Sequence, residues 1–97
     1  MARPKSKLSK DEAEALALQV LAFLLTDSRQ TSRFLALTGI APQDLRNVAA
    51  SPDLQAATLE YLLSDEGLLL MFCQEAGVDP AIVAPAHMLL TGPIAYD

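Results

Sequence analysis

Apolar positions recur at helical spacing along most of the chain, and this pattern predicts short α-helices throughout. The first predicted helix covers residues 10–25, where apolar side chains fill well over half of the circumference. Ser9 is followed three residues later by Glu12, which is the sequence of a capping box and indicates a helix start at Lys10. Because so apolar a helix needs neighbours on several sides, we expect it at the centre of the fold.

Glycine, proline and N-capping residues divide the rest of the chain into five further helices. Their predicted ranges are 27–38, 42–49, 52–63, 65–76 and 80–90. Thr26 and Ser64 are the predicted N-caps of two of them. Gly39 and Gly77 are predicted to end the same two helices in the left-handed conformation, and Pro85 is predicted to kink the last helix.

The connections between these helices are very short, so consecutive helices are expected to cross steeply. The predicted fold is therefore all-α, an orthogonal bundle of five to six short helices that forms a single domain over residues 9–92. Residues 1–8 are predicted to be a disordered basic tail, and residues 93–97 a C-terminal tail.

The stretch 23–45 matches the stretch 61–83 at an offset of 38 positions. This offset places Phe34 on Phe72, Gly39 on Gly77 and Pro42 on Pro80. In a leucine-rich chain such matches are more informative than matches between leucines. A period of this length is typical of a duplicated helical unit, so the pseudo-repeat predicts two three-helix units.

The composition is 52% hydrophobic and 20% charged, which is typical of a folded domain. A single cysteine cannot form an internal disulfide, and this favours a reducing compartment, the cytoplasm. Residues 1–25 have basic residues ahead of an apolar run, but Asp11, Glu12 and Glu14 separate the two, unlike in a secretion signal. The apolar run is also too short to span a bilayer, so no membrane association is expected.

The formal net charge of −5 and the pI near 4.6 argue against a general nucleic-acid binder. All seven Lys and Arg residues lie within residues 1–46, whereas residues 47–97 carry acids alone. An acidic docking face for a basic partner is one explanation. The other is helix capping, because most of the acids fall at predicted helix starts, where a negative charge is favourable.

Few side chains in this sequence could carry catalysis, and none is predicted to do so. His87 is the only histidine and has no nucleophile or carboxylate at helical spacing. Cys73 corresponds to apolar Leu35 across the 38-residue offset, so we expect a buried and unreactive thiol. No metal site, phosphate-binding loop or cofactor is predicted, and the protein is expected not to be an enzyme.

The segments FLALTG (Phe34–Gly39) and DEGLLLMF (Asp65–Phe72), followed by Glu75–Gly77 and Asp79–Pro80, resemble a family of short bacterial proteins known only as a domain of unknown function. The similarity runs from about Glu14 to Val83. It implies an all-helical cytoplasmic protein and no particular activity. Ala41 departs from the acidic residue expected before Pro42, which predicts a weak cap there.

The 38-residue offset also indicates a candidate partner surface. Phe34 and Leu37 indicate the inward side of the second predicted helix, so Ser32, Arg33 and Ala36 are expected to point outwards. Their counterparts in the fifth helix are Leu70, Met71 and Gln74.

Something must cover Leu70 and Met71, and there are two alternatives. One is the chain itself, through the sixth helix or residues 94–96, and this internal cover is favoured. The other is a second protein, with a homodimer as one version. The function predicted from the sequence is a small non-catalytic helical protein–protein interaction module whose partner is unknown.

The alternative function is DNA binding by a helix-turn-helix over residues 34–49. In that arrangement Gln43, Arg46 and Asn47 would face outwards, and these side-chain types can bind base edges.

Overall fold

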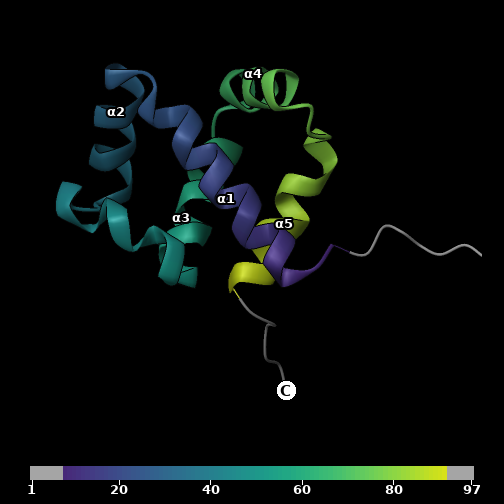
Figure 1. The fold of residues 1–97 in the computed structure, drawn as a ribbon. Helices are drawn as coiled ribbons and strands as arrows, with labels where there is room; N and C mark the ends of the chain where they lie inside the picture. The colour runs from purple at the N-terminus through teal and green to yellow at the C-terminus, as the bar shows by residue number, and fades with distance from the viewer. Residues whose placement is uncertain (1–7, 92–97) are drawn as a thin grey trace, which may run out of the picture.

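The computed structural model describes residues 8–91 and shows an all-α fold in this part of the chain (Figure 1). The α-helices are α1 (Lys10–Leu25), α2 (Ser28–Thr38), α3 (Pro52–Leu63), α4 (Glu66–Ala76) and α5 (Val83–Thr91). Two 3₁₀-helices, η1 (Pro42–Ala50) and η2 (Pro80–Ile82), connect them. The predicted fold class is confirmed. Residues 1–7 and 92–97, which hold nearly all of the two predicted tails, lie outside the described range.

The start of α1 is the predicted capping box. Ser9 Oγ accepts from the Glu12 N–H at 3.0 Å, and the Ser9 N–H donates to Glu12 Oε1 at 2.8 Å. Leu8, which the sequence analysis assigned to the tail, packs against the core and so belongs to the folded domain.

The corners after α1 and α3 differ from the prediction by one residue. Thr26 and Ser64 are C-caps, and the N-caps of α2 and α4 are Asp27 and Asp65. The Thr26 hydroxyl donates back to the Phe23 carbonyl oxygen at 2.7 Å, which turns it towards the end of α1. The aspartate carboxylates accept the N–H groups in the first turns of α2 and α4 instead, and an ionised acceptor at a helix N-terminus is the stronger cap.

Gly39 and Gly77 end α2 and α4 as predicted. Their φ angles are 76° and 69°, and no other described residue has a positive φ. The short corners make successive helices cross steeply, and α4 and the segment Pro80–Thr91 meet at 115°.

The segments that begin with Pro42 and Pro80 are less regular than predicted. Ala41 makes no side-chain cap, and residues 42–50 form a 3₁₀-helix rather than an α-helix. The helix predicted over residues 80–90 is divided into η2 and α5 at Val83, and the predicted kink at Pro85 stays a prediction. This division leaves Pro85 in the first turn of α5, where its missing N–H costs no helical hydrogen bond.

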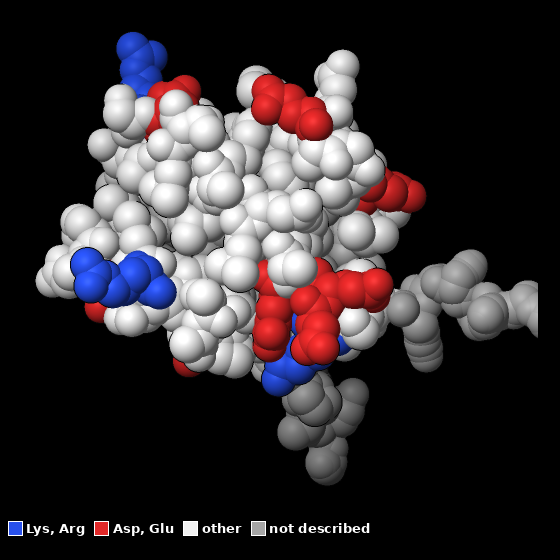
Figure 2. Space-filling view, viewed as in Figure 1, with Lys and Arg blue, Asp and Glu red and all other residues white. Residues whose placement is uncertain are grey.

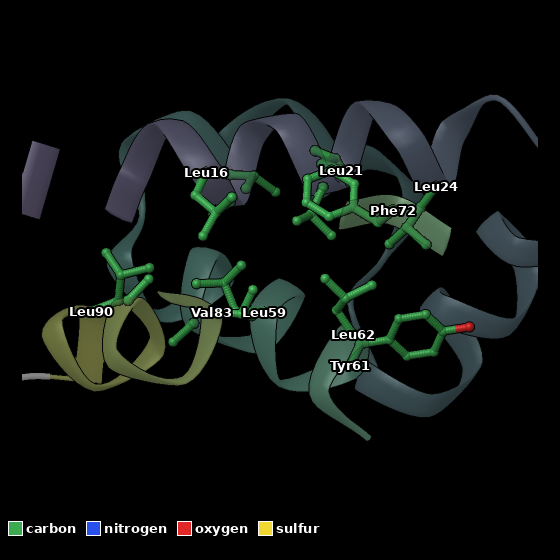
Figure 3. Close-up of a cluster of buried hydrophobic side chains, with 14 of the residues drawn as sticks. Leu16, Leu21, Leu24, Leu59, Tyr61, Leu62, Phe72, Val83 and Leu90 are labelled. Atoms are coloured by element: carbon green, nitrogen blue, oxygen red, sulfur yellow. The ribbon is translucent and has the colours of Figure 1, made fainter. Parts of the chain in front are cut away.

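The hydrophobic core lies between α1, α3 and α5. In Figure 3, Leu16, Leu21 and Leu24 of α1 point towards α3 and α5, from which Leu59, Leu62, Val83 and Leu90 point back. α1 has the several neighbours that were expected, since it packs on α2, α3, α5 and η1, but these neighbours leave its outer side open. Leu18 and Leu25, on its outer side, are 37% and 46% exposed.

Two aromatic pairs join the first half of the chain to the second, one between α1 and α4 and one between α2 and α3. Phe23 of α1 meets Phe72 of α4 edge to face at 5.4 Å between ring centroids. Phe34 of α2 meets Tyr61 of α3 in the same way at 5.3 Å. The 38-residue offset relates Phe23 to Tyr61 and Phe34 to Phe72, so it converts one pair into the other. The pseudo-repeat stays a prediction, and these contacts agree with it.

The left-handed glycines generate the first testable prediction. We expect Gly77→Ala to lower the free energy of unfolding by about 1 kcal/mol and Gly77→Val to lower it further. No atom lies within 4 Å of a Cβ built at Gly77, so the loss would come from backbone strain and not from a clash. Denaturant unfolding monitored by circular dichroism measures the change.

Gly67→Ala is the matched control for this measurement. Gly67 lies inside α4, and a Cβ there would be at an ordinary 3.6 Å from Asp65 Oδ1. Helix propensity then predicts a small gain of up to about 0.5 kcal/mol. Equal losses for Gly67→Ala and Gly77→Ala would show that the left-handed conformation is not the cause.

Candidate protein-interaction surface

The outer side of α4 carries the three residues predicted as a partner surface. Leu70 is 49% exposed, Met71 is 52% exposed, and Gln74 is exposed beside them. We call Leu70, Met71 and Gln74 the α4 face. The sixth predicted helix, now η2 and α5, does not cover this face, so that version of internal cover is wrong. Residues 94–96, the other predicted cover, lie outside the described residues.

The orientation of α4 follows from its own buried side chains. Leu68, Phe72 and Cys73 are buried, and at about 100° per residue they occupy one side of the helix. Phe72 is held by its edge contact with Phe23. The α4 face is centred on the opposite side, and it therefore points away from the core.

A groove borders the α4 face where α4 lies opposite the corner between α1 and α2. Its volume is about 480 Å³, and it is lined by Phe23, Thr26, Asp27, Ser28, Gln30, Leu68, Met71 and Glu75. Phe23 and Leu68 supply apolar surface, and Met71 belongs to both the groove and the α4 face. We call this the α1–α4 groove.

A long-range hydrogen bond positions the polar side of the groove. The Tyr61 hydroxyl donates to Gln30 Oε1 at 3.0 Å, which ties α2 to α3. A tyrosine hydroxyl is protonated at neutral pH, and burial raises the pKa of Tyr61 further.

The charged side chains that line the α1–α4 groove are acidic. Asp27 and Glu75 are its only charged lining residues among the described part of the chain. Arg33 stands 4.0 Å from Asp65, and both side chains are largely exposed, so this ion pair contributes little to stability. A ligand of the groove would therefore meet a mainly polar lining that includes two carboxylates, with apolar surface from Phe23, Leu68 and Met71.

Helix capping explains most of the acidic residues of the chain. The acids found at N-caps or in first turns are Asp11, Glu12, Asp27, Asp44, Asp53, Asp65, Glu66 and Asp79. Figure 2 shows one group of acidic side chains over the start of α1 and others scattered towards the edges of the face, with uncharged side chains between them. The acidic half of the chain is thus not gathered into one acidic surface on this face.

The three residues of the predicted DNA-binding alternative are exposed but do not share one ridge. Gln43, Arg46 and Asn47 lie on η1, whose 3₁₀ geometry repeats every three residues. Gln43 and Arg46 are therefore aligned along η1. Asn47 lies on the next ridge with Asp44, where Asn47 Nδ2 donates to Asp44 Oδ1 at 3.5 Å. A recognition helix presents such side chains from a single α-helical face.

Sequence reasoning missed two features near the surface. Leu37, interpreted as inward, is 64% exposed, because α2 turns Phe34, Thr31 and Leu35 towards the core. Thr31 tolerates this position since its hydroxyl donates to the Leu24 carbonyl oxygen at 3.0 Å. Phe23, now part of the groove, gave no signal beyond its match to Tyr61.

The candidate chemical groups lie away from the groove. His87 Nε2 is 4.0 Å from Glu60 Oε1, a contact between α5 and α3 that sequence spacing could not reveal. Cys73 is a buried free thiol. Among residues 8–91 no three His, Cys, Asp or Glu side chains are placed to hold a metal ion.

A family model described as "Protein of unknown function (DUF3572)" matches residues 10–93. The chain belongs to the DUF3572 family. The match agrees with the resemblance inferred from the FLALTG and DEGLLLMF segments, and it includes α1, α4 and the groove between them. In the corresponding comparisons, no curated protein and no solved structure matches this chain.

No single described helix of this DUF3572 protein is long and apolar enough to cross a membrane. One pair, α4 with Pro80–Thr91, reaches that length and composition together, but it is bent by 115°.

The Cys73 thiol generates a prediction about reactivity. Burial raises the pKa of the Cys73 thiol, and the Asp79 carboxylate raises it further. Little thiolate then exists at neutral pH, so Cys73 in the folded protein should react with a disulfide reagent on the order of tenfold or more slowly than in the unfolded chain. Thiol release followed by absorbance, with and without guanidinium, gives both rates, and equal rates would contradict a buried thiol.

Proposed function

We propose that this DUF3572 protein is a non-catalytic protein–protein interaction module that binds a partner through the α4 face and the α1–α4 groove. The observation that carries the proposal is the half-exposure of the apolar Leu70 and Met71 directly beside a groove that Met71 also lines. Contiguous exposed apolar surface is typical of sites that another molecule covers. Burial of these side chains on binding would supply about 25 cal/mol per Å² of apolar area.

The lining of the groove supports a partner segment of a particular chemistry. Phe23, Leu68 and Met71 would accept an apolar side chain. Asp27 and Glu75 would favour a lysine or arginine beside it, because opposite charges across an interface speed association and select the partner. We therefore propose a segment with an apolar anchor and an adjacent basic residue.

The chemistry of the remaining groups supports a role without catalysis. The raised pKa of the buried Cys73 thiol makes it a poor nucleophile. The carboxylate nearest to His87, that of Glu60, is mostly exposed, and solvent weakens the coupling that a catalytic pair needs. A buried free thiol also supports the cytoplasm as the compartment.

Substitution of the α4 face tests this function. Affinity purification at native expression level, followed by mass spectrometry, should identify a protein captured by the wild type and lost with Leu70→Arg and with Met71→Arg. Both positions are half-exposed, so arginine should leave the fold intact. Met88→Arg is the matched control, since Met88 is 63% exposed on α5, away from the groove. Equal capture by all four forms would exclude the α4 face.

The two carboxylates of the groove generate a separate prediction. With the captured partner purified, Glu75→Gln should slow association and make it less sensitive to salt, because it removes one attractive charge. Asp53→Asn removes an exposed acid at the start of α3, outside the groove lining, and should leave the salt dependence unchanged. Stopped-flow or biolayer kinetics at low and high salt compare the two. An identical salt dependence for wild type and Glu75→Gln would contradict a basic residue at the groove.

A further inference from the structure

The outer side of α1 carries a second apolar surface, independent of the α4 face. Ala15, Leu18, Ala22 and Leu25 are all exposed, and they follow one another at intervals of three, four and three residues. We call these four residues the α1 stripe. The spacing is that of the a and d positions of a coiled coil. Over three helical turns the α1 stripe contains no charged residue.

The surroundings of the α1 stripe leave it open to another molecule. α1 packs on α2, α3 and α5 through its opposite side, where Val20 and Leu24 are fully buried. In the view shared by Figures 1 and 2, α1 crosses the front of the molecule, and uncharged side chains cover the middle of that face. Gln19 and Thr26, both exposed, are the polar neighbours of the α1 stripe on α1.

We propose that two copies of this chain pair through the α1 stripe, with their α1 helices antiparallel. The order small, large, small, large makes the α1 stripe complementary to itself only in that orientation. A two-fold axis beside the middle of the stripe sets Leu18 against Ala22 of the second copy, and Leu25 against Ala15 of the second copy. Each leucine then fills the space above an alanine, which is how knobs and holes interlock at a close helix pair.

The charges at the two ends of α1 favour the same orientation. Asp11 and Glu12 stand exposed in the first turn of α1, with Glu14 close by and one basic residue, Lys10, next to them, and Figure 2 shows mainly acidic side chains near the start of this helix. Parallel pairing would set these acids beside their own copies, and like charges at that distance repel. Antiparallel pairing places the acids of the two copies at opposite ends of the contact. Each set then lies near the start of α2 of the second copy, where the exposed residues include Arg29 as well as Asp27.

The size of the contact sets the expected strength. Three turns of one helix make a small contact, so we expect weak pairing that depends on protein concentration. Sedimentation equilibrium over a series of concentrations should show a monomer–dimer equilibrium. A wild-type chain that stays monomeric at about 1 mM would overturn the proposal and leave the α1 stripe to a different protein.

Arginine substitution tests which surface pairs. Leu18→Arg should raise the dissociation constant by more than about tenfold, because it buries an unpaired charge in each half of the contact. Leu37→Arg is the matched control, since Leu37 is 64% exposed on α2, outside the stripe, and this variant should dimerise like the wild type. Dimerisation that Leu18→Arg leaves unchanged, or that only Leu70→Arg abolishes, would overturn pairing through α1. The α4-face proposal does not depend on either result.

Disulfide trapping tests the orientation and keeps the proposal testable if an arginine variant fails to fold. The double variant Leu18→Cys/Ala22→Cys should form covalent dimers on oxidation. In the antiparallel pair, the cysteine at position 18 of one copy faces the cysteine at position 22 of the second copy. Ala22→Cys alone should not form covalent dimers, since a disulfide needs its two Cα atoms within about 7 Å. Oxidation of the wild type under the same conditions shows how much covalent dimer forms through buried Cys73. Covalent dimers from Ala22→Cys alone would indicate parallel pairing and would overturn the antiparallel arrangement.

Discussion

The packing of α3 against α1 and α5 is the contact on which the rest of the fold depends. Leu59 and Leu62 of α3 are fully buried there, as are Val20 of α1 and Val83 of α5. Truncating a leucine in such a place costs about 2–5 kcal/mol. Because a domain has only about 5–15 kcal/mol of stability in total, one cavity in this layer would remove a large share. The other helices, α2 and α4, are held by smaller contacts at either end of this layer.

The corners determine how α2 and α4 leave the core. The helix before each of them ends at a C-cap with a hydroxyl side chain. α2 and α4 themselves both start at an aspartate N-cap and end at a left-handed glycine. Each is also held by one aromatic edge contact, Phe34 with Tyr61 or Phe72 with Phe23. A helix held along one side leaves its other side to solvent. On α2 that side carries one large exposed apolar residue, Leu37, among polar residues, whereas on α4 it carries the adjacent pair Leu70 and Met71, and this pair singles out the α4 face.

The two proposed surfaces belong to different helices and have different consequences. The α4 face and its groove suit a separate protein with an apolar and a basic residue, whereas the α1 stripe is complementary to itself. A dimer formed through the α1 stripe would carry two α1–α4 grooves. Two linked sites can bind a partner that has two copies of the same segment more tightly than either site alone, by effective concentration. Dimerisation through the α1 stripe would then strengthen the binding of such a partner, and the bound partner would stabilise the dimer.

Local chemistry in the sequence determined where helices begin and end, because capping residues, glycine and proline act within a few residues of their own position. Ser9, Gly39, Gly77 and the start of α3 at Pro52 were predictable for that reason. The exposure of Leu70 and Met71 was not, because the sequence favoured cover by the chain itself. Which side of each helix is covered was decided by the tertiary structure alone. Burial depends on the positions of distant helices, and so the outward position of Leu37, the open side of α1 and the meeting of Phe23 with Phe72 had no local signal.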